Sequence, residues 1–195
     1  MVFPKTPARA TGASGSTLEG VIGVQELVSS MPSTWGKADR FDQTFHDKLR
    51  RIITDTMLSE LDNVVRQSPS LENRGHVIGV AYMCALETIT SYGYSRTEDF
   101  IREHFPETYK DHANRFQDEY RNRLVHDWNL AGKVALLPND EPPTVKDDYF
   151  EVGLKNFAKA FETAVKDFLD KLGGNKELQK KAVQRYEAIR LSRTR

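Results

Sequence analysis

Apolar residues recur at helical spacing along most of this chain, and this spacing limits the fold to one built mainly of helices. From Lys37 to about Gln67, apolar residues recur at steps of three and four: Phe41, Phe45, Leu49, Ile52, Ile53, Met57, Leu61, Val64 and Val65. This spacing gathers them on one side of an α-helix. The sequence Ser68-Pro69-Ser70 then interrupts the pattern. The spacing therefore predicts a long amphipathic helix over 37–67.

Further helices are expected downstream. An apolar run over 75–92 predicts a second helix that ends at Gly93, a residue suited to the left-handed conformation that follows many helices. A short third helix, 97–104, is expected to stop before Pro106. From Pro106 a fourth helix is expected, with a stripe made of Tyr109, Ala113, Phe116, Tyr120 and Leu124.

The stretch from Asn129 to Asp148 has a different composition. It contains three prolines and a short apolar run, so an edge strand or half of a hairpin is expected there. The last core helix is predicted over 149–172, where Gly173 and Gly174 end it. Its inward residues are expected to be Phe150, Leu154, Phe157, Ala158, Phe161, Val165, Phe168 and Leu169.

These elements predict an all-α protein, an antiparallel helical bundle with a small loop or β-hairpin excursion between the last two core helices. We expect residues 1–17, rich in Pro, Gly, Ser and Thr, to be a flexible tail. Residues 18–172 are expected to form a single helical-bundle domain. Residues 173–195 are expected to be a basic C-terminal helix or tail.

Composition excludes several classes of protein. The 195 residues carry 28 Lys and Arg against 28 Asp and Glu, with a mean hydropathy of −0.58. This balance argues against a membrane span, a disulfide-rich fibre and a uniformly basic nucleic-acid-coating protein. The chain has one cysteine, Cys84, which lies in an apolar run and is expected to be a small core residue. A lone cysteine fits a reducing compartment, so the expected location is cytoplasmic.

The zero net charge is divided unevenly along the chain. Residues 171–195 hold eight basic and two acidic residues, a net charge of +6, which leaves −6 for residues 1–170. Such a cationic segment could fold back on its own acidic body, reach for RNA, or simply be a solvated helix end.

The sequence lacks the common motifs of metal sites and of activated nucleophiles. Five histidines, His46, His76, His104, His112 and His126, are scattered without an H-E-x-x-H pattern or a Cys/His cluster. No G-x-S-x-G is present. No metal or cofactor is therefore expected.

One polar cluster stands out at the end of the fourth predicted helix, where Arg121, Asn122 and His126 fall within six residues. On a regular helix Asn122 and His126 lie about 40° apart, so the amide can orient the imidazole. An imidazole can exchange protons near neutrality, and a guanidinium can neutralise charge on a pentacoordinate phosphate. These residues suit metal-independent phosphodiester cleavage, provided that the helix loosens, because Arg121 and His126 would be about 140° apart on a regular one. The alternative is an ordinary surface helix end, where cations favour the helix dipole.

The pattern Arg121-Asn122-x-x-x-His126 resembles the R-x4-6-H motif of the HEPN superfamily, named for higher eukaryotes and prokaryotes nucleotide-binding. The layout over about 37–172 is similar too, with the motif at the end of a late helix and one core helix after it. The resemblance implies an RNA-cleaving site built across a homodimer, with Arg121 and His126 catalytic and Asn122 supporting. It also implies a toxin or phage-defence setting, with an antitoxin or other protein as a partner.

Two alternatives stay open beside the ribonuclease. Many members of the superfamily bind nucleotides or scaffold partners without cutting RNA, so a non-catalytic module is the competing hypothesis. A coincidental resemblance of an unrelated helical domain is the other. In the antitoxin-paired ribonuclease toxins a Tyr follows two residues after the His, whereas this chain has Trp128. Modification at that Tyr is therefore not carried over, and Trp128 is interpreted as either a base-stacking residue or a core plug.

Glu87 is a further candidate on the second predicted helix. It lies beside Met83 and Cys84, close to an apolar face. A buried carboxylate needs a partner, which Arg121 or Arg123 could supply; otherwise Glu87 reaches water at the edge of the stripe.

Overall fold

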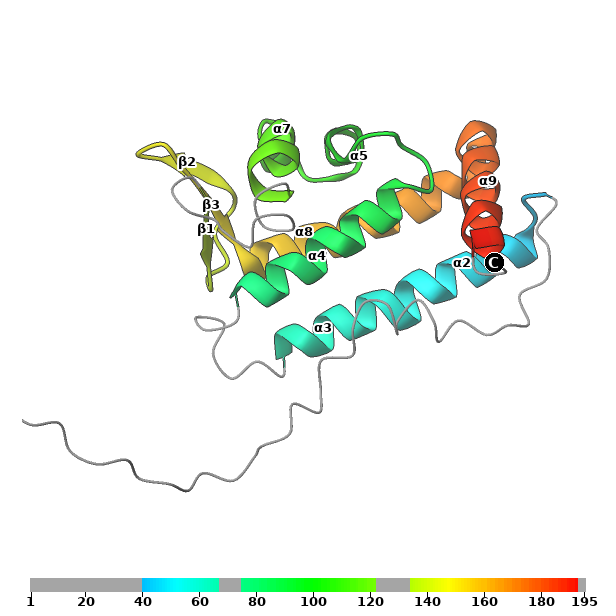
Figure 1. The fold of residues 1–195 in the computed structure, drawn as a ribbon, viewed down its shortest axis with the longest axis horizontal. Coiled ribbons are helices and arrows are strands. Elements are labelled where there is room, and N and C mark those ends of the chain that lie inside the picture. The colour runs from blue at the N-terminus through cyan, green and yellow to red at the C-terminus, as the bar shows by residue number, and fades with distance from the viewer. Residues whose placement is uncertain (1–39, 67–74, 122–133, 193–195) are drawn as a thin grey trace, which may run out of the picture. The chain divides into compact units, whose positions relative to one another are not determined.

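The computed structural model describes residues 40–66, 75–121 and 134–192. The chain divides into two units, 1–35 and 36–195, and every described residue belongs to the second. Of the described residues 74% are helical, and a small three-stranded sheet accompanies the helices (Figure 1). No described helix is long and apolar enough to span a membrane.

The first predicted helix is a continuous run of three segments: α2 (Gln43–Arg51), the π-helix η1 (Ile52–Leu58) and α3 (Ser59–Arg66). The Asp42 side chain caps its start by accepting a hydrogen bond from the Phe45 amide at 2.8 Å. Three residues at four-residue intervals are buried: Phe45, Leu49 and Ile53. A repeat of four runs ahead of an α-helical turn of 3.6 residues and falls behind the wider turn of a π-helix, so the two drifts offset each other. The π segment therefore helps to keep Leu61, eight residues beyond Ile53, in the core.

The next two helices match their predicted positions. Helix α4 spans Gly75–Thr90 and α5 spans Thr97–His104. The expected reason for Gly93 was wrong, because its backbone is not in the left-handed region. What the glycine provides is space, since a Cβ there would lie 2.8 Å from Leu178 Cδ2 and 3.3 Å from Phe168 Cε2.

The fourth predicted helix is interrupted. It is divided into α6 (Glu107–Lys110), α7 (Ala113–Arg115) and the π-helix η3 (Phe116–Arg121), with a turn at Asp111 and His112. At that turn the ring of His112 lies 5.5 Å from the ring of Phe150. The predicted stripe is nonetheless confirmed as far as the structure describes it, because Tyr109, Ala113, Phe116 and Tyr120 are all buried.

The excursion forms a sheet that is larger than predicted. Strand β1 (Val134–Leu137) pairs in parallel with β3 (Tyr149–Gly153), and β2 (Thr144–Lys146) pairs antiparallel with β3, giving the order β1-β3-β2. Residues 149–153 were expected to be helical, and that expectation was wrong. Tyr149, the first residue of β3, is exposed, whereas Phe150 and Val152 are buried. Burial at every second residue is typical of a strand.

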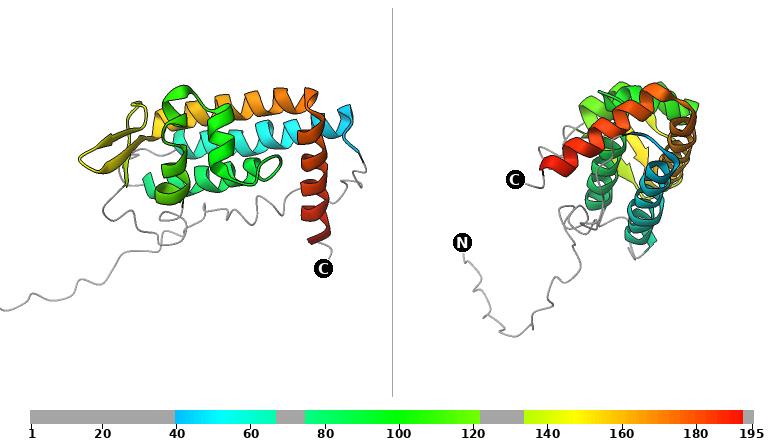
Figure 2. Two further views of the ribbon diagram at one scale, coloured as in Figure 1. Left: turned by 90° about the horizontal axis from the view of Figure 1, so that it is seen from above. Right: turned by 90° about the vertical axis from the view of Figure 1, so that its right-hand side faces the viewer.

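Two helices complete the chain, α8 (Leu154–Gly174) and α9 (Lys176–Ser192). Contacts link α4 both to α3 and to α8, and the views in Figure 2 show these helices running side by side. Helix α9 crosses the end of α8 (Figures 1 and 2).

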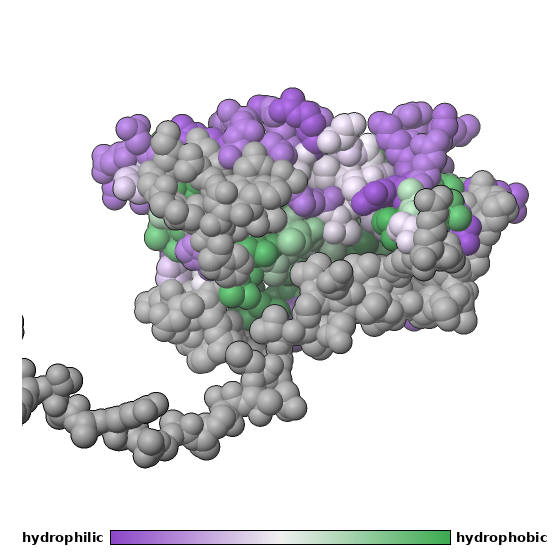
Figure 3. All heavy atoms as spheres, in the orientation of Figure 1, coloured by the Kyte–Doolittle hydropathy of each residue, from purple (hydrophilic) through white to green (hydrophobic). Residues whose placement is uncertain are grey.

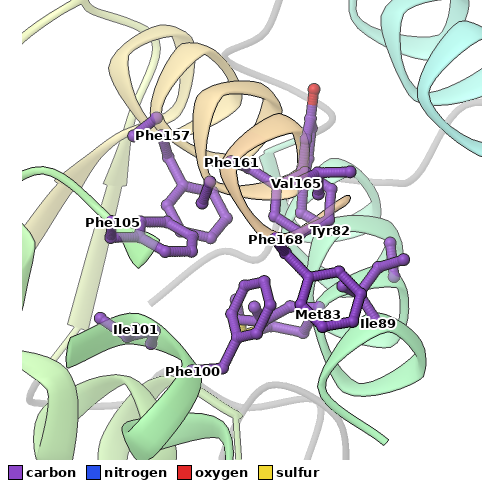
Figure 4. Packing of buried hydrophobic residues seen from close by; sticks show 14 of the residues in the cluster. Tyr82, Met83, Ile89, Phe100, Ile101, Phe105, Phe157, Phe161, Val165 and Phe168 are labelled. Carbon is purple, nitrogen blue, oxygen red and sulfur yellow. The ribbon is translucent and has the colours of Figure 1, made fainter. Parts of the chain in front are cut away.

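The core is rich in aromatic rings, and Figure 4 shows Phe100 of α5, Phe105 just after it and the rings of α8 meeting side chains of α4. Phe105 and Phe157 stack with ring centroids 5.9 Å apart, and Tyr82 meets Phe161 edge to face at 5.6 Å. Such ring pairs add about 1 kcal/mol each beyond the area that they bury. The rings fix the helices whose ends carry the polar residues considered next.

Candidate functional site

The predicted catalytic segment begins where η3 ends, at Arg121. Tyr120, the residue before it, is buried and holds the end of η3 against α8. Its ring lies 6.1 Å from that of Phe157 and 5.6 Å from that of Phe116. Phe116 in turn stacks on Phe157 at 5.3 Å, with an angle of 13° between the ring planes. The backbone of Arg121 therefore starts from a firmly packed position.

The Tyr120 hydroxyl is a buried polar group without a partner among the described residues. Burial raises the pKa of this phenol, and the neighbouring Tyr109 and Tyr82 raise it further. A buried hydroxyl without a hydrogen bond costs free energy. Tyr109 differs, because its hydroxyl donates to Asn156 Oδ1 at 2.7 Å.

The remaining members of the predicted site, Asn122 and His126, lie outside the described residues, as do Arg123, Leu124 and Trp128. The Arg121 side chain is likewise not described. The separation of Arg121 and His126 therefore stays a prediction. The segment that leads to them is π-helical as far as Arg121.

The two candidates on α4 are both described. Glu87 is partly buried, and so is Cys84, one turn earlier. Burial raises the pKa of the Cys84 thiol, and the Glu87 carboxylate adds to this effect. A thiol held protonated is a poor nucleophile. Cys84 was expected to be a small core residue, and the structure places it only partly buried, at the edge of the core. The proposed partners of Glu87, the side chains of Arg121 and Arg123, lie outside the described residues.

The most connected titratable cluster is one that the sequence pattern did not single out, around His104 on α5. Its Nδ1 lies 2.7 Å from Asp167 Oδ2 on α8, and its Nε2 lies 2.6 Å from the Tyr94 hydroxyl. Lys171 Nζ sits 3.0 Å from the same Asp167 oxygen and 3.8 Å from Glu103 Oε1. The chain of contacts ties α5 and the turn before it to α8.

Chemistry fixes the direction of the hydrogen bond to Asp167. A carboxylate only accepts, so Nδ1–H of His104 donates to it, while Nε2 lies within hydrogen-bonding distance of the Tyr94 hydroxyl, which is also hydrogen-bonded to Glu103. Burial lowers the pKa of His104 and outweighs the hydrogen bond to Asp167 and the charge of Glu103, which raise it. The imidazole is therefore neutral near pH 7.

The carboxyl of Asp167 responds in the opposite sense to its surroundings. Partial burial tends to raise its pKa, but the hydrogen bonds from His104 and Lys171 and the charge of Lys171 outweigh this and lower the pKa overall. The cluster thus holds a neutral imidazole between a phenol and an ionised carboxylate.

This arrangement resembles the histidine-orienting half of a catalytic triad, but here it acts structurally. The His104 side chain has an exposed fraction of 0%, which closes the imidazole to a substrate, and burial with the nearby Glu103 raises the pKa of the Tyr94 phenol. A sequence signal did exist. Thr97, Phe100, Ile101 and His104 share the inward face of α5 at three- and four-residue steps, so a histidine there had to be buried and satisfied.

The other described histidines have separate surroundings. His46 Nε2 lies 3.0 Å from the Leu169 carbonyl oxygen, which joins α2 to α8. His76 is exposed near the start of α4, and His112 packs on Phe150. Among the described residues no three His, Cys, Asp or Glu side chains gather as a set of metal ligands.

Comparisons were made with models of protein families, with curated proteins and with solved structures. None of the three gave a match to this chain. The case for a function therefore depends on this chain's own residues.

Proposed function

We propose that this protein is a HEPN-like, metal-independent endoribonuclease of a cytoplasmic toxin or phage-defence system. Arg121 and His126 cleave RNA across a homodimer, with Asn122 orienting the imidazole. His126 exchanges the proton of the attacking or leaving oxygen, and Arg121 neutralises the charge that develops on the phosphate.

The observation that carries the proposal is the motif Arg121-Asn122-x-x-x-His126 placed directly after a buried aromatic anchor. Tyr120 packs on Phe157 of α8, the long core helix that follows the excursion. A reactive group must be held to within a fraction of an ångström of its productive position, and a packed helix end supplies such a base.

Further support comes from the arrangement of the elements. The described part is mostly helical, the motif starts at the end of a late helical segment, and one core helix, α8, comes after it. This order is the one that the resemblance implies. The small sheet β1-β3-β2 occupies the excursion between the motif and α8.

The test is cleavage of single-stranded RNA by purified protein in EDTA. Wild type should cleave, and His126→Ala and Arg121→Ala should each lose about a hundredfold in rate or more. His76→Ala serves as the matched control, since it removes an exposed histidine from another helix. Equal cleavage by wild type and His126→Ala, or no cleavage by wild type over a range of RNAs, would refute the assignment.

One observation favours the second candidate, a non-catalytic interaction or nucleotide-binding module. Helix α4 exposes part of an apolar stripe, with Val77 47% exposed and Val80, Ala81 and Cys84 partly exposed. Figure 3 shows hydrophobic side chains at the surface over this helix. Apolar surface of this kind suits a protein partner. A stable complex with an antitoxin-like protein, together with RNA that stays intact regardless of His126, would favour this function.

A further inference from the structure

Most cations in the described body are neutralised by neighbouring carboxylates. Ion pairs of this kind join Arg50 to Asp170, Arg102 to Glu98, Lys159 to Asp140, Lys166 to Glu162 and Lys171 to Asp167. The paired carboxylate offsets most of the attraction that such a cation would have for a polyanionic partner. The pairs therefore make most of the body surface a poor match for a phosphate backbone.

Helix α9 differs from the rest of the described body in gathering several exposed, unpaired cations on one element. Lys176, Lys180 and Lys181 are exposed, and none of them has a carboxylate oxygen within 4.0 Å among the described residues. Arg185 donates to the neutral Ser91 hydroxyl at 2.9 Å rather than to an acid. The two acids of α9 do not cancel this charge, since Glu187 pairs with Arg190 and leaves Glu177 alone among three lysines.

This cationic helix is fixed to the body rather than a detachable arm. Leu178 and Ala182 are buried, and the ring of Tyr186 meets that of Phe45 edge to face at 5.3 Å. At its start Asn175 Oδ1 accepts the amides of Glu177 and Leu178 at 3.0 and 3.2 Å. The lysines are therefore held on a packed scaffold, so less side-chain and backbone freedom is lost when they bind.

We propose that Lys176, Lys180 and Lys181 of α9 form a docking surface for the phosphate backbone of single-stranded RNA. The charge is complementary, and each lysine offers three donors to phosphate oxygens. This proposal rests on the proposed function for the choice of RNA, but it concerns binding away from the cleavage motif. Contacts of this kind position RNA without reading its sequence.

An anionic membrane is the less suitable partner. A helix that lies in a membrane interface needs a free apolar face beside its basic one. In α9 the apolar side is already used against the body, through Leu178, Ala182 and Tyr186. What α9 presents outward is mainly charge, which fits a hydrophilic polyanion.

The experiment measures binding of a short fluorescein-labelled single-stranded RNA by fluorescence anisotropy. The full chain carries His126→Ala, so that RNA remains intact and binding is separated from cleavage. In this background the triple variant Lys176→Gln/Lys180→Gln/Lys181→Gln is compared with Lys48→Gln/Lys146→Gln/Lys155→Gln. The control removes the same charge from three exposed lysines of the body that also have no carboxylate within 4.0 Å among the described residues.

The α9 variant should bind roughly tenfold more weakly, and the slope of log K against log salt should fall by about 2, as expected for three lost phosphate contacts. The body variant should bind as the parent does. Equal losses in the two variants, absence of binding by the parent, or α9-dependent binding to phosphatidylserine vesicles in place of RNA would overturn the proposal. Cleavage by the chain with native His126 is scored separately, so failure of the ribonuclease assignment would show there and not in the anisotropy.

Discussion

His104 and Asp167, 63 positions apart in the chain, are joined by a 2.7 Å hydrogen bond from Nδ1–H to Oδ2. The imidazole is buried on all sides, while the carboxylate is 42% exposed and is also held by Lys171. Because the imidazole is buried between α5 and α8, protonating it places a charge inside their contact, which burial opposes and the bond to Asp167 only partly offsets.

The stability of the protein should fall as the pH is lowered below about 6.5. Burial lowers the pKa of His104 in the folded state, so the unfolded chain takes up the proton first, and acid favours unfolding. The lowered pKa of Asp167 acts in the same direction at lower pH, below its ordinary value of 3.8. Urea unfolding at pH about 7.5 and about 5.5 measures the first of these effects.

The variant His104→Gln isolates the contribution of this histidine. It should cost roughly 2 kcal/mol at neutral pH because Tyr94 and Asp167 lose their shared partner. It should also reduce the loss of stability between the two pH values. His76→Gln serves as the control, because it makes the same substitution at an exposed histidine of α4. An equally steep pH dependence in His104→Gln would show that another group is responsible.

Two buried tyrosines should respond differently to loss of the hydroxyl. Tyr109→Phe removes a hydrogen bond to Asn156 and should destabilise the fold by about 1 kcal/mol. Tyr120→Phe removes a buried hydroxyl that has no partner among the described residues, so stability should be unchanged or slightly higher. Urea denaturation compares the two. A larger loss for Tyr120→Phe than for Tyr109→Phe would contradict this expectation.

Gly153, the N-cap of α8, and Gly174, its last residue, offer a comparison between a crowded and an open glycine. A Cβ on Gly153 would overlap the Glu141 carbonyl oxygen and lie 2.6 Å from Asn139 Oδ1, so Gly153→Ala should cost about 3 kcal/mol. Gly174→Ala meets nothing within 4 Å at the end of the same helix and should be neutral or mildly stabilising. Thermal unfolding of both variants checks the difference. Similar melting temperatures for both would mean that the 138–143 loop yields easily.

Gly93 and Leu178 should show energetic coupling. Gly93→Ala places a methyl group 2.8 Å from Leu178 Cδ2, which should cost about 1 kcal/mol and disturb the seat of α9. In a Leu178→Ala background the clash is relieved, so the same substitution should cost less. A double-mutant cycle of unfolding free energies measures this coupling. Additive costs would place the strain at Phe168 instead.

Most helices could be located from the sequence, because their apolar residues recur every three or four positions. The stripe from Tyr109 to Tyr120 is buried as the spacing predicts, and the boundaries of α5 follow from Pro106 and its inward face. The first stripe is confirmed in part: Phe45, Leu49, Ile53 and Leu61 are buried, Ile52 and Met57 are half-buried, and Val64 is exposed. The motif at Arg121 could also be named from the sequence, while its catalytic role stays a prediction. These features depend on neighbours within a few residues.

The strand at 149–153, the histidine cluster and the position of α9 depend on tertiary contacts. The segment 149–153 fits either a helical or an alternating pattern, and pairing with β1 and β2 makes it a strand. His104 is hydrogen-bonded to Tyr94 and to Asp167, and α9 packs against Gly93. These contacts join different elements of the chain. Local periodicity does not predict such partners, because they meet only when separate helices pack.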